Sequence, residues 1–231
     1  MELREGEFIK KLRGRDVVTR NSWFWDRTET LWGKHLSDEK IVNYGEFGVC
    51  CGLSLAYALD KWVIPNGGRA VGLDPYKAPR SHSAELYERN KELMVHNLNQ
   101  WSPQFATKVV YDNSPWEQED KEPFELHVFT ESSELLWSDV NPVTFDDVIP
   151  RGYFDLWFVD GAHSGLFAFQ DIVAALKLVR VGGIVVVDDF NRTYHRGPRV
   201  RDAVRAFEMV CSDRIDYLFA TNKQIGFRRV K

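Results

Sequence analysis

The stretch that decides the fold is residues 154–191, FDLWFVDGAHSGLFAFQDIVAALKLVRVGGIVVVDDFN. Residues 154–159 form an apolar run broken by a single aspartate, as expected for a strand buried on both faces. Residues 168–179 carry apolar side chains at helical spacing, and the glycine pair at 182–183 is predicted to close this helix. Residues 184–187 form a second, β-branched strand. Two apolar strands joined by a helix predict a βαβ unit with adjacent parallel strands.

Polar and acidic side chains follow each of these strands. Asp160 comes directly after the first strand, and His163 follows it closely. Asp188 and Asp189 come directly after the second strand. The carboxyl ends of parallel neighbours lie at one edge of a sheet, where open α/β sheets hold their ligands. The sequence therefore predicts that these four side chains meet at one site.

A second candidate ligand site is the glycine-bearing turn in residues 41–52, IVNYGEFGVCCG, where a short strand leads into a helix. Its pattern is Glu46-x-Gly48-x-x-x-Gly52. Glycines here let the backbone pass close to a ligand and present amide N–H groups at the helix start. The spacing differs from the G-x-G-x-x-G of dinucleotide-binding folds. An acid beside this backbone suits a ligand that carries an ammonium group.

The next predicted strand, residues 69–73, ends at Asp74. An acid about two dozen residues beyond a glycine turn is where related folds hold a ribose diol. The alternative, a solvated aspartate at a strand end, is weaker beside the glycine turn.

Composition narrows the class of protein. The 231 residues suit one α/β domain, and 44% hydrophobic content is enough for a sizeable core. With 30 basic and 34 acidic residues the net charge is −4, which gives no electrostatic case for nucleic acid as a partner. Three cysteines fit neither a disulfide framework nor a zinc spacing. The charged N-terminus is not a signal peptide and no apolar run approaches a membrane span, so we expect a cytoplasmic protein with no membrane partner.

Two regions are predicted along the chain: an N-terminal helical or lid segment at 1–40 and a main domain at 41–231, with a surface insertion at about 101–124. The N-terminal segment carries several large apolar side chains: Trp23, Phe24, Trp25, Leu31 and Trp32. Packing against the flank of the sheet is the favoured interpretation, since aromatic residues more often pack than contact ligands. A lid over the ligand site is the alternative.

The remaining pattern completes the sheet. Residues 125–130, ELHVFT, read as the third core strand, after a polar helix at 81–100. A helix is predicted at 200–210, and the strands DYLFAT and IGFRRV that follow are joined by a short loop, which predicts an antiparallel hairpin.

Five features in this order resemble the class I S-adenosylmethionine-dependent methyltransferases. They are the ExGxxxG turn, the acid after the second strand, FDLWFVDGAH, VGGIVVVDDF and the terminal hairpin. The pair DGAH and DDF resembles the branch that holds Mg-dependent sugar and macrolide O-methyltransferases and cephalosporin-hydroxylase-like proteins. The resemblance covers residues 41–230 and implies an α/β fold. This is a Rossmann-like, doubly wound and mostly parallel sheet of seven strands with a C-terminal antiparallel hairpin.

The resemblance also implies which residues bind S-adenosylmethionine. The methionine half would be held by Glu46, Gly48, Gly52 and Ser54, the ribose by Asp74, and the adenine by Glu131 and Ser132, with Asp160 facing the sulfonium. The adenine assignment departs from the family, because this chain has TESS where Gly-Asp-Ser is usual, and Asp112 is an alternative contact.

The resemblance further implies that Asp160, Asp188 and Asp189 bind Mg²⁺, a hard cation that prefers oxygen ligands. Asp160 and His163 are the candidate catalytic residues. His163 as the general base is weighed equally against a His163 that only hydrogen-bonds a strand end or a carboxylate. His195, in the loop after Asp189, is a second candidate base, although contact with the substrate or shielding of the site is the favoured role of this loop.

The function expected from the resemblance is a Mg-dependent O-methyltransferase acting on a hydroxyl of a small molecule, such as a sugar-bearing natural product. One alternative is a metal-dependent hydroxylase-like protein of the same fold, and another is a non-catalytic cofactor-binding protein. A nicotinamide-dependent enzyme ranks lowest because the glycine spacing differs. The oligomeric state stays open, with a homo-oligomer as one alternative.

Overall fold

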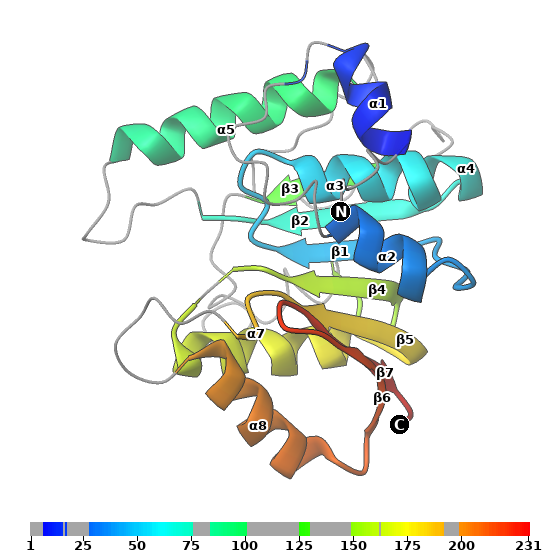
Figure 1. Ribbon diagram of the computed structural model, residues 1–231, viewed down its shortest axis with the longest axis vertical. Helices are drawn as coiled ribbons and strands as arrows, with labels where there is room; N and C mark the ends of the chain where they lie inside the picture. Colours follow the sequence, from blue (N-terminus) through cyan, green and yellow to red (C-terminus); the bar gives the residue numbers. More distant parts are fainter. Residues whose placement is uncertain are drawn as a thin grey trace.

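A sheet of seven strands in the order β3-β2-β1-β4-β5-β7-β6 forms the centre of the computed structural model (Figure 1). The structure describes residues 7–15, 17, 28–75, 84–100, 125–129, 149–161, 163–191 and 199–231. The strands are β1 (Tyr44–Phe47), β2 (Arg69–Leu73), β3 (Glu125–Phe129), β4 (Phe154–Val159), β5 (Val179–Val187), β6 (Ile215–Ala220) and β7 (Ile225–Arg229).

Strand direction confirms the predicted topology. The five strands β3, β2, β1, β4 and β5 are parallel, whereas β7 runs antiparallel to both of its neighbours, β5 and β6. The chain therefore has a mostly parallel sheet with a C-terminal antiparallel hairpin. Because β7 enters the sheet beside β5, the loop before β7 lies at the carboxyl end of β5.

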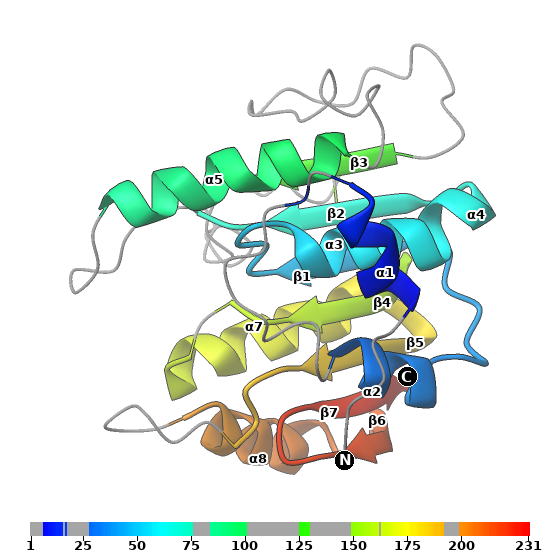
Figure 2. The same cartoon turned by 45° about the horizontal axis from the view of Figure 1, so that its top comes forward.

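Helices cover both faces of this sheet (Figures 1 and 2). They are α1 (Glu7–Arg13), α2 (Glu29–His35), α3 (Leu53–Ala58), the π-helix η2 (Leu59–Val63), α4 (Ile64–Asn66), α5 (Ala84–Asn99), α7 (Gly165–Leu178) and α8 (Val200–Cys211). Helices α1 to α5 contribute to the core on one face, and α7 and α8 to the core on the other. In β4, Leu156 and Phe158 point to the first core, whereas Trp157 and Val159 point to the second. This alternation is what a strand buried on both faces requires.

The described part of the N-terminal segment packs against the first core. Trp32 in α2 is fully buried, with its ring centroid 5.0 Å from that of Phe158 and 5.5 Å from that of Trp62. Phe8 and Leu12 of α1 are buried in the same core. Packing therefore accounts for these side chains, while the aromatic residues at 23–25 lie outside the described residues.

The prediction that glycines at 182–183 close the helix before β5 is wrong. Helix α7 already ends at Leu178, and both glycines lie inside β5, which begins at the next residue. Gly182 has φ 83°, and a Cβ on Gly183 would lie 2.9 Å from the carbonyl oxygen of Phe154. The pairing of β4 with β5 also shifts register between Phe154 and Leu156. The glycines therefore permit an irregular strand start rather than a helix end.

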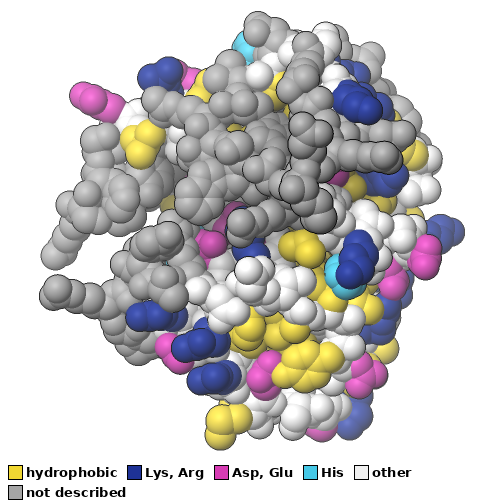
Figure 3. Space-filling model, in the orientation of Figure 1, with side chains coloured by type: hydrophobic (Ala, Val, Ile, Leu, Met, Phe, Trp, Pro, Cys, Tyr) yellow, Lys and Arg dark blue, Asp and Glu magenta, His cyan; other side chains and the backbone are white. Residues whose placement is uncertain are grey.

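One face of the molecule shows described residues of both charges. On the face drawn in Figure 3, basic side chains lie beside acidic ones and are spread over the molecule. Among the residues that the structure describes, no helix is both long enough and apolar enough to cross a membrane.

One carboxylate fastens the start of β4 to the chain before β1. Asp155 is buried, and its Oδ2 accepts hydrogen bonds from the backbone N–H groups of Val42 (2.9 Å) and Asn43 (2.8 Å). Its Oδ1 accepts a hydrogen bond of 2.6 Å from Nε of Arg180 in β5. A single side chain thus holds three segments that meet at the amino edge of the sheet.

We expect Asp155→Ala to lower the free energy of unfolding by about 2–4 kcal/mol, because it leaves partly buried donors without their acceptor. Urea denaturation measures this loss. Asp213→Ala is the matched control, since Asp213 forms a 3.5 Å ion pair with Lys231 between exposed side chains and such pairs contribute at most about 1 kcal/mol. Equal stability of the two variants would contradict this account of Asp155.

Candidate functional site

The turn after β1 brings backbone close to the end of β4. Gly48 has φ 85° and Gly52, the residue before α3, has φ 78°, both in the left-handed region that glycine adopts most readily. A Cβ on Gly48 would lie 2.1 Å from the carbonyl oxygen of Asp160, so no other residue fits there without a shift of the backbone. The glycine turn and the backbone of Asp160 are therefore in direct contact.

Glu46 is fully buried next to this turn. Its Oε2 accepts a 2.5 Å hydrogen bond from the Tyr44 hydroxyl, whereas its Oε1 has no hydrogen-bond partner among the described residues. Burial raises the pKa of Glu46 to about 8, although the hydroxyls of Tyr44 and Ser54 favour the carboxylate. At neutral pH the side chain is therefore mostly protonated in the ligand-free protein. It is an acid that a nearby positive charge would ionise.

Asp74 follows β2 and holds the glycine turn in place. Its Oδ2 accepts a 2.8 Å hydrogen bond from the backbone N–H of Cys50, which has φ 51°. A non-glycine residue in that conformation is strained, and the hydrogen bond helps to stabilise it. Ser54, in the first turn of α3, is buried near Glu46. The sequence predicts Asp74 as a ligand contact. The structure adds a second role, since Asp74 also holds the backbone of the glycine turn.

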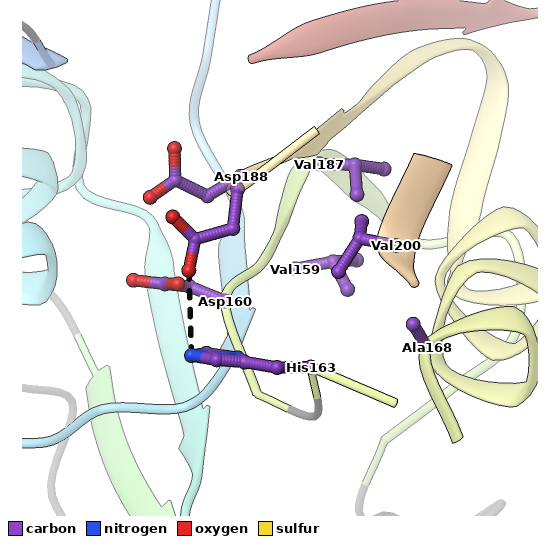
Figure 4. Close-up of a pocket in the computed structure, with 8 residues that line it drawn as sticks. Val159, Asp160, His163, Ala168, Val187, Asp188 and Val200 are labelled. Carbon is purple, nitrogen blue, oxygen red and sulfur yellow. Dashed lines mark ion pairs between the residues drawn. The ribbon is translucent and has the colours of Figure 1, made fainter. Parts of the chain in front are cut away.

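The acids that follow β4 and β5 come together as predicted (Figure 4). Burial, and then the negative charges of Asp188 and Asp189, raise the pKa of Asp160 well above its usual range. Burial also raises the pKa of Asp188, whose side chain has an Oδ1 without a hydrogen-bond partner in the described structure. Asp189 has φ 54°, a conformation that aspartate tolerates better than most residues and that turns the chain away from β5.

His163 lies beside these acids. Its Nε2 is 3.3 Å from Oδ2 of Asp189, an ion pair when the histidine is protonated (Figure 4). The same hollow has an apolar wall on its other side, formed by Val159, Ala168, Val187 and Val200. The structure therefore places His163 and all three aspartates around one pocket, polar on one side and apolar on the other.

Two residues of this site were not predicted from the sequence. Lys223, in the loop between β6 and β7, has its Nζ 3.4 Å from Oδ2 of Asp188. Gln224, fully buried, donates a hydrogen bond from Nε2 to the hydroxyl of Thr28 (3.3 Å) and favours the ionised form of Asp188. The expected topology could have pointed to them. A last strand that runs antiparallel beside β5 begins at the carboxyl end of β5, so the loop before that strand lies at this site.

Some predicted contacts cannot be placed. Glu131 and Ser132, their alternative Asp112, and His195 all lie outside the described residues. Within the described ranges, no three acidic, histidine or cysteine side chains already surround a position that could hold a metal ion. Asp188 and Asp189 each have one carboxylate oxygen engaged, the first with Lys223 and the second with His163.

The part of the chain that forms this site matches a known protein family. Residues 46–190, more than half of the chain, match the family described as a methyltransferase domain. The match begins at Glu46 and ends just after Asp189, so it spans the glycine turn and the acid cluster. A search of curated proteins found no match.

Solved structures share the fold at low identity. The O-methyltransferase TomG from Streptomyces achromogenes, in complex with SAM, is 16% identical with a TM-score of 0.55, over 100% of this chain and 93% of that one. An O-methyltransferase from Bacillus cereus, in complex with SAH, is 16% identical with a TM-score of 0.52, over 96% and 86%. The methyltransferase MycE, in complex with Mg, SAH and mycinamycin VI, is 14% identical with a TM-score of 0.56, over 99% of this chain and 56% of that one.

The family match and the strand order agree with one another. The chain belongs to the methyltransferase-domain family and has the fold of the class I S-adenosylmethionine-dependent methyltransferases.

Proposed function

We propose that the protein transfers a methyl group from S-adenosylmethionine to a hydroxyl of a small molecule. The observation that carries this proposal is the direct contact between the glycine turn after β1 and the acid-bearing end of β4. A cofactor held on the turn would present its reactive group to the pocket that contains Asp160 and His163. Two of the similar solved structures are O-methyltransferases, which supports a hydroxyl as the acceptor. A sugar-bearing natural product is the acceptor class that we propose, and the mycinamycin complex of MycE supports it.

The proposed cofactor contacts follow from the chemistry of each side chain. Glu46 would face the ammonium group of the methionine part, with Gly48, Gly52 and Ser54 beside the methionine backbone atoms. Asp74 would accept hydrogen bonds from the ribose hydroxyls while its Oδ2 holds the turn through Cys50. The carboxylate of Asp160 would lie toward the sulfonium, whose positive charge favours an acid beside it.

We also propose that Asp160, Asp188 and Asp189 bind Mg²⁺. The donor set suits this ion, since it consists of carboxylates, and the buried Oδ1 of Asp188 lacks any partner within the described structure. The three side chains do not yet surround a common position, so binding requires carboxylates to turn. When bound, the ion would lower the pKa of the acceptor hydroxyl and orient it.

The reaction itself needs alignment and removal of a proton. The hydroxyl oxygen forms a bond to the methyl carbon as the carbon–sulfur bond breaks, and the hydroxyl proton passes to a base. His163 is the proposed base. Donation from its Nε2 to Asp189 would fix the tautomer in which Nδ1 accepts the proton. The apolar wall formed by Val159, Val187 and Val200 would exclude water from the reacting atoms.

The direct test is turnover. We expect the purified protein, given S-adenosylmethionine and a panel of hydroxylated natural products, to form S-adenosylhomocysteine and a methylated product detected by mass spectrometry. His163→Ala should slow turnover about 100-fold or more, the usual contribution of a general base. Product formation that requires Fe²⁺ and O₂ without S-adenosylmethionine would identify a hydroxylase-like enzyme instead. Cofactor binding without turnover of any acceptor would favour a binding protein.

The role of Asp74 is tested by binding. Asp74→Ala should weaken S-adenosylhomocysteine by about 1.5–3 kcal/mol, because hydrogen bonds to a charged group are lost. Calorimetric titration measures the change, and circular dichroism verifies the fold. Asp216→Ala, an exposed acid on β6, is the matched control and should bind like the unchanged protein. Unaltered affinity of the Asp74 variant would remove this residue from the cofactor site.

The raised pKa of Glu46 predicts that cofactor binding releases a proton. In the free protein its pKa of about 8 leaves it mostly protonated at pH 7, and the ligand ammonium group favours the carboxylate. Binding of S-adenosylhomocysteine at pH 7 should therefore release up to about one proton, and affinity should rise as the pH increases toward 8. Calorimetry in two buffers of different ionisation enthalpy measures the release. Glu46→Gln should remove this contribution, and an unchanged release would show that Glu46 does not face the ammonium group.

A further inference from the structure

The lysine in the last hairpin is placed by specific contacts. Thr221 and Lys223 belong to a tight turn in which the Thr221 hydroxyl accepts hydrogen bonds from the backbone N–H of Lys223 (3.1 Å) and of Gln224 (2.8 Å). The backbone N–H of Phe190 donates to the carbonyl oxygen of Lys223 (2.8 Å). The hairpin loop is thereby tied to the residues that directly follow Asp188 and Asp189.

The side chain of Lys223 points back into the acid cluster. It is 14% exposed, and its ammonium group lies 3.4 Å from Oδ2 of Asp188, whose side chain is 7% exposed. Its positive charge also favours the ionised form of Asp160. A lysine is rarely buried to this extent unless it is paired. Lys223 therefore pairs with Asp188 and offsets part of the negative charge of the cluster.

This placement bears on the magnesium ion proposed above. Asp188 offers one oxygen that is buried without a partner and one that is occupied by the Lys223 ammonium group. An ammonium group and a divalent cation beside the same carboxylate repel each other. Both satisfy the same excess of negative charge, so the presence of one reduces the affinity for the other.

We propose that Lys223 is a positioning residue that acts as the resident counter-ion of the Asp160–Asp188–Asp189 cluster and competes with Mg²⁺ for Asp188. The inference rests on the proposed function only for the identity of the divalent ion. Because the open Oδ1 and the Lys223-paired Oδ2 belong to one carboxylate, an ion bound at Oδ1 repels the ammonium group and favours its movement away from Oδ2. Lys223 then sets the Mg²⁺ concentration at which the site fills, without itself touching the reacting atoms.

The test compares Mg²⁺ binding by calorimetry and by the shift in melting temperature, in the absence of any methyl acceptor. Lys223→Met, which keeps the length of the side chain but removes its charge, should bind Mg²⁺ at least about tenfold more tightly than the unchanged protein. Lys223→Arg, which keeps the charge, should show no such gain. Lys61→Met removes an exposed lysine of η2 and should behave like the unchanged protein. Lys223→Met that binds no more tightly than the unchanged protein overturns the proposal.

Amine labelling tests the same idea in the unchanged protein, should Lys223→Met fail to fold. Limited acetylation followed by peptide mass spectrometry should show more modification of Lys223 when Mg²⁺ is present, and equal modification of Lys61. Labelling of Lys223 that does not respond to saturating Mg²⁺ overturns the competition. Another outcome would count against the magnesium requirement of the proposed function without touching the proposal for Lys223. If only Lys223→Met binds Mg²⁺, and the unchanged protein methylates in the presence of a chelator, the proposal for Lys223 is supported and the magnesium requirement fails.

Discussion

Negative charge at the carboxyl edge of the sheet is the constraint on which the site depends. Glu46 in β1, Asp160 after β4 and Asp188 after β5 belong to three neighbouring parallel strands, so their separation is set by strand register before any ligand binds. Burial makes each negative charge costly, and the pKa values of all three side chains are raised. The surrounding structure must therefore supply protons or positive charge.

The protein meets this need locally at Glu46, at Asp188 and at the neighbouring Asp189. Glu46 keeps its proton at neutral pH, Asp188 is paired with Lys223, and Asp189 lies against His163. S-adenosylmethionine carries two positive charges, on its sulfonium and its ammonium group, and a site with excess negative charge is complementary to such a ligand. The excess of negative charge at this edge of the sheet thus favours a cationic cofactor.

How much of this could be predicted from the sequence depends on the range of each interaction. The strands β4 and β5, the helix between them and the acids that follow them have local signals, and the structure confirms them. The end of α7 was predicted at Gly182-Gly183 because glycine often closes helices. In the structure both glycines lie in β5, and Gly183 is needed there because a Cβ would lie too close to the carbonyl oxygen of Phe154. Lys223 was missed because its position depends on β7 pairing with β5, a long-range contact that no local pattern contains. Likewise, the hydrogen bond from Cys50 to Asp74 arises only once β1 and β2 are adjacent.

The hairpin loop also links the acid cluster to the N-terminal part of the chain. Gln224 donates to Thr28, the residue before α2, while its neighbour Lys223 extends to Asp188. The backbone of the loop is held by the Thr221 hydroxyl and by Phe190, so it resists displacement. A lysine side chain, by contrast, has several rotatable bonds and can swing away while its backbone stays fixed. The exchange of cations proposed for Lys223 therefore needs the movement of one side chain only and leaves the contact between Gln224 and Thr28 intact.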